Sequence, residues 1–166
     1  MFWLTDHAKS TLRATDVCAA KHLHEGRPGG DEYQRLNLEA VDRGVEVERI
    51  FIYTEWTGEI DERIRKQAVA GVHTLRVHEA ALRSELRSDM AIWDESYGSE
   101  LSFNASGEIV DSYVTFSPQD VGRLLERYNR IRTKAEIWPV GGNPPPSGKF
   151  RRRPKAHSSE DSPPTD

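Results

Sequence analysis

The feature that most constrains the fold is a helical segment that leads directly into a buried strand. Residues 31–43 place apolar side chains at helical spacing, and Gly44 follows as a C-terminal cap. Residues 45–53 (VEVERIFIY) alternate at first and then become continuously apolar, which suits a strand of a parallel sheet. Because neighbouring parallel strands are usually joined by a helix, this pair of segments predicts an α/β domain.

Further segments extend this alternation in both directions. Residues 5–13 favour a short helix, and residues 59–70 form a helix closed by Gly71. Ser117 caps a last helix with Pro118 at its first position. We expect further strands at residues 12–17, 72–77, 89–94, 98–103 and 108–116, the last two as a hairpin turning at 104–107. The sequence thus predicts a mixed, mostly parallel sheet with helices on both faces.

Proline marks the end of the predicted domain. Seven of the nine prolines lie at or after Pro139, and the segment 139–166 contains almost no large apolar residue. Such a segment cannot bury enough apolar surface to offset its conformational entropy. We therefore expect an α/β domain at residues 1–138 and a disordered, Pro-rich basic tail at 139–166.

Charge is divided unevenly between these two parts. The tail has five basic and three acidic side chains, and because the whole chain carries −4, residues 1–138 carry −6. An acidic body argues against nucleic-acid binding by the folded part. The stretch from Pro144 to Arg153 combines prolines with basic residues and is the expected site for a protein partner.

Several classes of protein are disfavoured by composition. No apolar run approaches the ~18 residues that a membrane helix needs, and no signal peptide is visible. The single cysteine, Cys18, excludes an internal disulfide and a multi-cysteine zinc site. We expect a cytoplasmic protein that holds no metal and no cofactor.

Four stretches, in their order along the chain, resemble one half-unit of the phospholipase D superfamily. They are residues 13–17, 37–52, 67–72 and 88–94, and with the last helix they cover most of residues 10–135. The resemblance implies the α/β half-unit of that family. Because the family's active site usually forms between two half-units, it also implies a homodimer across the face that bears residues 89–94.

Active members of that family use a His-x-Lys-x4-Asp motif, in which histidine attacks phosphorus and lysine stabilises the phosphate oxygens. In this chain Asp94 takes the aspartate place, Arg87 the histidine place and Asp89 the lysine place. Arg87 is not a nucleophile, and Asp89 would repel phosphate. The resemblance therefore implies a degenerate site without catalytic residues, in which Arg87, Asp89, Trp93 and Asp94 are candidate ligand-binding residues.

These residues favour a non-catalytic, phospholipase D-like module that regulates or binds a ligand, rather than an enzyme. One alternative is a phosphodiesterase or nuclease with altered catalytic residues, using carboxylates with a metal, or His73 or His78. The other is an adaptor that acts through its Pro-rich basic tail.

Overall fold

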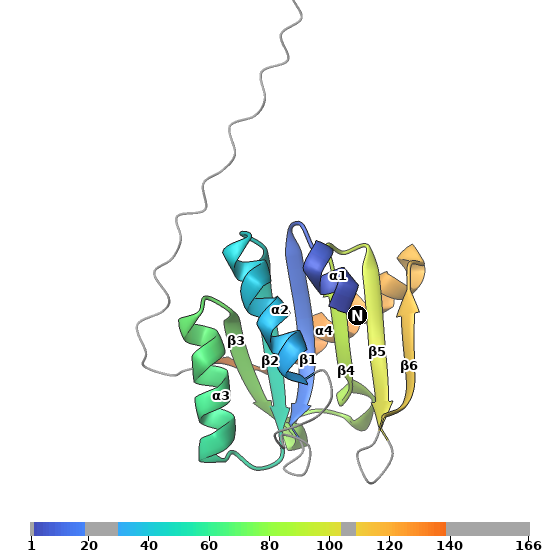
Figure 1. The fold of residues 1–166 in the computed structure, drawn as a ribbon. Coiled ribbons are helices and arrows are strands. Elements are labelled where there is room, and N and C mark those ends of the chain that lie inside the picture. Colours follow the sequence, from blue (N-terminus) through green and yellow to red (C-terminus); the bar gives the residue numbers. More distant parts are fainter. Residues whose placement is uncertain (1, 19–29, 104–108, 139–166) are drawn as a thin grey trace, which may run out of the picture.

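A single sheet forms the centre of the protein in the computed structural model, which describes residues 2–18, 30–103 and 109–138 (Figure 1). Its strand order is β6-β5-β4-β1-β2-β3-β7. The strands are β1 (Thr11–Cys18), β2 (Glu46–Tyr53), β3 (His73–His78), β4 (Asp89–Trp93), β5 (Tyr97–Phe103), β6 (Ile109–Thr115) and β7 (Glu136–Ile137). The helices are α1 (Phe2–His7), α2 (Gly30–Asp42), α3 (Gly58–Val69) and α4 (Pro118–Arg132), with 3-10 turns η1 (Glu79–Ala81) and η2 (Ser84–Leu86).

The expected mixed α/β sheet is confirmed, but its parallel part is smaller than predicted. Strands β1, β2 and β3 pair in parallel. The pairings of β4 with β1 and β5, of β5 with β6, and of β7 with β3 are all antiparallel. The two helix-linked crossovers therefore build only the central part, and the β4–β6 meander extends it from the edge of β1.

Local signals in the sequence fix three of the helix ends. Gly44 and Gly71 both have positive φ, +87° and +96°, as residues that end a helix in the left-handed conformation require. The Ser117 hydroxyl accepts a hydrogen bond from the backbone N–H of Asp120 (3.4 Å), which caps α4 as predicted. The helix expected at residues 5–13 is wrong in extent, because α1 ends at His7 and β1 begins shortly after.

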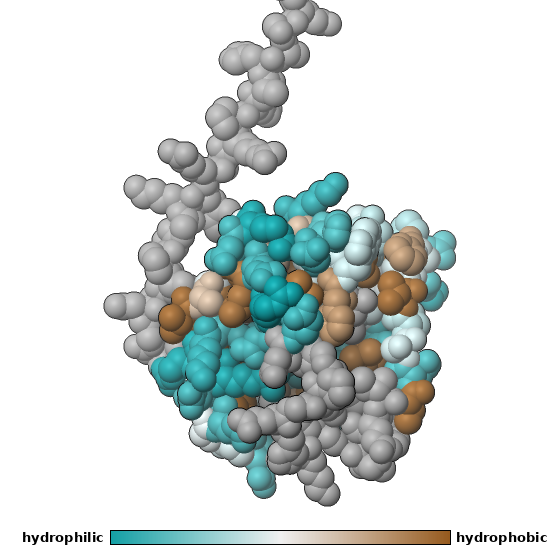
Figure 2. All heavy atoms as spheres, in the orientation of Figure 1, coloured by the Kyte–Doolittle hydropathy of each residue, from teal (hydrophilic) through white to brown (hydrophobic). Residues whose placement is uncertain are grey.

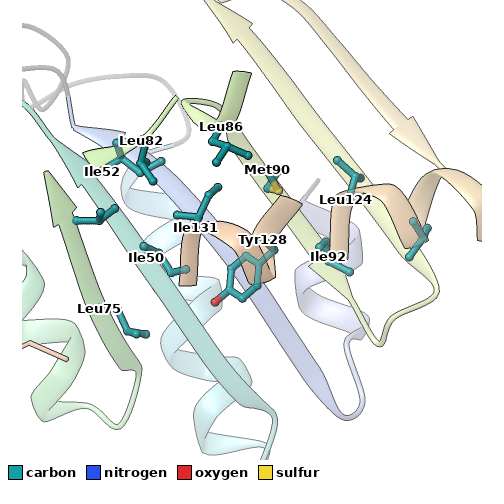
Figure 3. Packing of buried hydrophobic residues seen from close by; sticks show 12 residues of the cluster. Ile50, Ile52, Leu75, Leu82, Leu86, Met90, Ile92, Leu124, Tyr128 and Ile131 are labelled. Carbon is teal, nitrogen blue, oxygen red and sulfur yellow. The ribbon is translucent and has the colours of Figure 1, made fainter. Parts of the chain in front are cut away.

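Helices cover both faces of the sheet, as predicted (Figure 1). Helices α1, α2 and α3 lie on one face and α4 lies on the other. Successive residues of β2 point to opposite faces, so Ile50 packs with the α4 residue Tyr128, while Phe51 packs with Ile64 of α3. Figure 3 shows Leu124, Tyr128 and Ile131 of α4 directed at the sheet.

The predicted tail at 139–166 and the hairpin turn at 104–107 lie outside the described residues. None of the described helices is long and apolar enough to cross a membrane.

Candidate functional site

The four candidate ligand-binding residues fall at opposite ends of β4. Because β4 runs antiparallel to β1, Asp89 lies near the end of β1 and Asp94 lies near its beginning. Asp94 lies five residue steps after Asp89 along the extended chain, a distance of about 16 Å. The structure therefore does not gather Arg87, Asp89, Trp93 and Asp94 around one ligand.

The Asp94 carboxylate joins the turn after β4 to the segment that leads into β1. Its carboxylate accepts hydrogen bonds from the backbone N–H groups of Lys9 (3.0 Å), Ser10 (2.7 Å) and Thr11 (3.0 Å). Burial alone would raise the pKa of Asp94, but these hydrogen bonds outweigh it and lower the pKa. Asp94 also has a positive φ of 52° at the turn from β4 to β5. Its contacts within the described residues are those of a structural carboxylate that fixes the entry to β1.

Trp93 belongs to the core, which argues against a role in ligand binding. It is 0% exposed and packs in the cluster beneath α1 and α2 that includes Leu4 and Leu12. Its indole Nε1 donates a hydrogen bond to the Thr5 hydroxyl at 3.0 Å. With its polar atom paired and its ring enclosed, Trp93 has no surface to offer a ligand in this conformation.

Arg87 and Asp89 are the two candidates at the same end of β4. Arg87 is exposed, and its Nη2 donates to the carbonyl of Leu82 at 3.1 Å. Asp89 is half-buried and accepts a hydrogen bond from the backbone N–H of Val17. Asp89 thereby extends the pairing of β4 with β1 beyond the point where the strands themselves pair.

The expected two-fold interface across the face bearing residues 89–94 is also wrong. β4 is an inner strand, paired with β1 on one side and β5 on the other. Met90 and Ile92 are buried with α4, while Ala91 and Trp93 are buried with α1. Neither face of this strand is open to a second copy of the chain.

The structure reveals a buried polar cluster that the sequence analysis missed. Arg49, in the middle of β2, is 3% exposed and donates to the carboxylate of Asp16 and the amide oxygen of Gln67, each at 2.7 Å. Its guanidinium group also lies 5.5 Å from the ring centroid of Tyr33 and 5.0 Å from that of Phe51. The signal in the sequence was an arginine directly before the apolar run of a buried strand, where a charge needs a partner.

This cluster extends from the middle of β2 to Asp16, near the carboxyl end of β1, and α/β sheets commonly bind ligands at the carboxyl ends of their strands. Arg49 Nε and Gln67 Nε2 are buried and have no hydrogen-bond partner among the described residues. Burial raises the pKa of Tyr33 to about 12. Burial, followed by the charge of Asp16, raises the pKa of the Cys18 thiol. The tyrosine and the cysteine are therefore neutral at physiological pH, and the unpaired N–H groups and the Tyr33 hydroxyl are the donors that the cluster can offer.

A second polar cluster, on the opposite face of the sheet, fastens α4. Glu48 is 6% exposed and accepts hydrogen bonds from the hydroxyl of Tyr128 (2.8 Å) and from Nε of Arg132 (2.8 Å). His73 Nδ1 lies 2.7 Å from the same carboxylate. Burial alone would raise the pKa of Glu48, but the bonds from His73, Arg132 and Tyr128 lower it to about 2.

The histidines considered for an altered enzyme do not converge. His73 begins β3 and His78 ends it, and His78 Nδ1 accepts a hydrogen bond from the backbone N–H of Ala80 at 3.1 Å. Within the described ranges, no three His, Cys, Asp or Glu side chains are arranged to hold a metal ion.

Comparison with known proteins identifies the fold and no family. No protein-family model matches the chain, and no curated protein matches it. Among solved structures, the chain is similar to TrmBL2, an archaeal chromatin protein whose structure is described as showing a novel mode of DNA binding. The TM-score is 0.56 and the sequence identity 16%, over 81% of this chain. The match spans 48% of TrmBL2, about half of its length.

This similarity overturns the expectation that nucleic acid is an unlikely partner, because a domain of this fold occurs in a protein that binds DNA. The expectation relied on net charge, which does not describe how charge is distributed. Helices α1–α3 carry eight acidic and four basic side chains, and Figure 2 shows hydrophilic residues gathered over α2 and α3. Residues 118–134, which include α4, carry five basic and two acidic side chains. The helices on the two sides of the sheet therefore differ in sign, with a net charge of −4 on α1–α3 and +3 on residues 118–134.

Proposed function

We propose that the chain is a non-catalytic, phospholipase D-like domain that serves as a regulatory module of a nucleic-acid-associated protein. One observation carries the non-catalytic part. At the start of β4, where the resembled motif has its nucleophile and its phosphate-binding lysine, this chain has Arg87 and Asp89. An arginine cannot form the covalent intermediate, and a carboxylate disfavours a bound phosphate.

The contacts of the two aspartates support the same proposal. Asp89 bonds to the backbone of β1, and Asp94 bonds to three backbone N–H groups before and at the start of β1. Both carboxylates serve the fold, so neither is free to act as a general acid or base without breaking these bonds.

The association with nucleic acid rests on the similarity to TrmBL2 and on the basic helix α4. A phosphate backbone is recognised first by clustered cations, and α4 provides them although the body as a whole is acidic. A cytoplasmic location with Cys18 as a free thiol belongs to the same proposal.

Turnover of a generic phosphodiester tests the non-catalytic part. The full chain is incubated with bis(p-nitrophenyl) phosphate, alone, with Mg²⁺, Mn²⁺ or Zn²⁺, and with a chelator. We expect no nitrophenol release above the rate of the buffer. Release that depends on the protein, and that is lost in His73→Ala or His78→Ala, would replace this proposal with the enzyme alternative.

Equilibrium binding to a labelled DNA duplex tests the association. We expect fluorescence anisotropy to rise with protein concentration at low salt and to fall again as salt is added. An anisotropy that stays at the value of free DNA, at protein concentrations up to roughly 10⁻⁴ M, would reject the association.

A further inference from the structure

We propose that the exposed side of α4 binds the phosphate backbone of duplex DNA. This inference rests on the proposed function and names the surface responsible. Four residues form what we call the α4 basic stripe: Arg123, Arg127, Arg130 and Lys134. Arg123, Arg127 and Arg130 are spaced by four and three residues, which keeps them on one side of a helix with about 3.6 residues per turn, and Lys134 follows two residues after the end of α4.

Three of the four cations are available to a partner. The side chains of Arg123 and Arg130 are 76% and 55% exposed, and Lys134 is also exposed. Arg123 lies 3.0 Å from Asp120 and Arg130 lies 4.0 Å from Glu85, both as surface ion pairs. Such pairs contribute little to stability, so each arginine can exchange its carboxylate for a phosphate at small cost.

The fourth cation fixes the helix in place. Arg127 is 28% exposed and donates to Glu100 and to the Ser88 hydroxyl, each at 2.8 Å. Its Nη2 also donates to the carbonyl of Glu85 at 3.1 Å, in η2. Arg127 therefore ties α4 to η2 and to β5, which holds the three exposed cations on a rigid support.

The dimensions of the stripe fit a duplex. From Arg123 to Lys134 the chain rises by about 16 Å, at about 1.5 Å per helical residue. This length matches roughly five base-pair steps at about 3.4 Å per step along one strand. Arg83 and Arg87, which flank η2 and are exposed, widen the basic area beside the helix, since Leu86 of η2 packs in the same core as α4.

Duplex DNA fits this surface better than a membrane does. Membrane-surface helices combine basic residues with apolar side chains that enter the lipid. None of the large apolar side chains that are exposed in the described part of the chain belongs to α4. A row of cations without such side chains matches a regular line of phosphates.

The test compares two triple variants of the full chain in the DNA anisotropy experiment. One combines Arg123→Gln, Arg130→Gln and Lys134→Gln. The control combines Arg35→Gln, Arg65→Gln and Lys66→Gln, which removes the same charge from α2 and α3, where these side chains are 51%, 52% and 68% exposed. Circular dichroism melting curves establish that both variants remain folded.

We expect the α4 variant to bind about tenfold or more weakly at about 50 mM salt, and its plot of log K against log salt to be shallower by about 2 to 3. We expect the control to retain the affinity and slope of the parent. Equal affinity of the parent and both variants would overturn the inference while leaving the association intact, since another surface would then carry it. Binding to phosphatidylserine vesicles but not to DNA would overturn both the inference and the proposed association with nucleic acid. If the α4 variant loses DNA binding as expected but the protein cleaves the phosphodiester, only the non-catalytic part of the proposed function would be overturned.

Discussion

Replacing Glu48 should weaken the fold by an amount that depends on pH. The Glu48 carboxylate joins β2 to α4 through Tyr128 and Arg132, and it also contacts His73. The pKa of Glu48 falls from 4.5 to about 2 because these hydrogen bonds favour the charged form over the opposing effect of burial. At about 1.4 kcal/mol per pH unit, this difference corresponds to about 3 kcal/mol of folding free energy.

Part of this free energy is lost to solvent screening. His73 and Arg132 are 40% and 49% exposed, so we expect Glu48 to contribute about 2 kcal/mol to the free energy of unfolding at about pH 7. Since the folded protein holds the proton of Glu48 less tightly than the unfolded chain does, the stabilisation is fully present above pH 4.5 and is lost as the pH falls towards 2. By about pH 3, more than half of it should be gone.

Urea unfolding, followed by tryptophan fluorescence, measures this difference for Glu48→Gln at about pH 7, 5 and 3. We expect the variant to be about 2 kcal/mol less stable than the parent at the two higher pH values. At the lowest pH, the loss of stability should be less than half of that amount. The control is Glu62→Gln, whose pair with Lys66 has both side chains about 70% exposed and should change stability by less than about 0.5 kcal/mol. A loss for Glu48→Gln that is independent of pH, or no larger than the control, would refute the reasoning.

Three further substitutions test the structural roles assigned around β4 and β5. Trp93→Ala should cost roughly 3–5 kcal/mol in urea unfolding because the side chain is fully buried, whereas a ligand contact at the surface would leave stability unchanged. Asp94→Asn should cost roughly 1–2 kcal/mol and speed hydrogen exchange at the Lys9 amide, and unaltered exchange there would contradict the assigned role. Gly98→Ala should cost roughly 1–3 kcal/mol, since the new Cβ would lie 2.5 Å from Cδ1 of the buried Leu124; an unchanged melting temperature would count against this.

The order of elements was predictable because local chemistry determines it. The apolar run at 45–53 predicted β2, and Gly44 and Gly71 predicted two helix ends that the structure confirms. Nothing in the sequence predicted β7. Its two residues are exposed, and the strand exists through backbone pairing with β3, a long-range contact that side-chain patterns do not encode. The proportion of parallel pairing was overestimated because helix-linked crossovers do not reveal which edge of the sheet the later strands join.

The candidate site was less predictable, since nearness in sequence does not give nearness in space along a strand. Residues 89–94 are contiguous, but an extended backbone sends alternate side chains to opposite faces and separates the ends. From the sequence Trp93 is a candidate ligand contact, whereas its full burial makes it a packing residue. Arg49 was overlooked because its partners, Asp16 and Gln67, are distant in sequence and meet only in the folded protein.

The charge of the body illustrates why a sum over the sequence cannot exclude a polyanionic partner. Salt screens exposed charges over about 8–10 Å at physiological ionic strength. Two helical layers, each about 10 Å thick, and the sheet between them separate the exposed side of α4 from the carboxylates on α2 and α3 by more than about 20 Å. A duplex against α4 is therefore influenced mainly by the α4 basic stripe and its near neighbours, and only weakly by the acidic helices on the far side. An α/β sheet covered on both faces can thus present a positive surface on a chain whose net charge is negative, and the far acidic face disfavours binding in any other orientation.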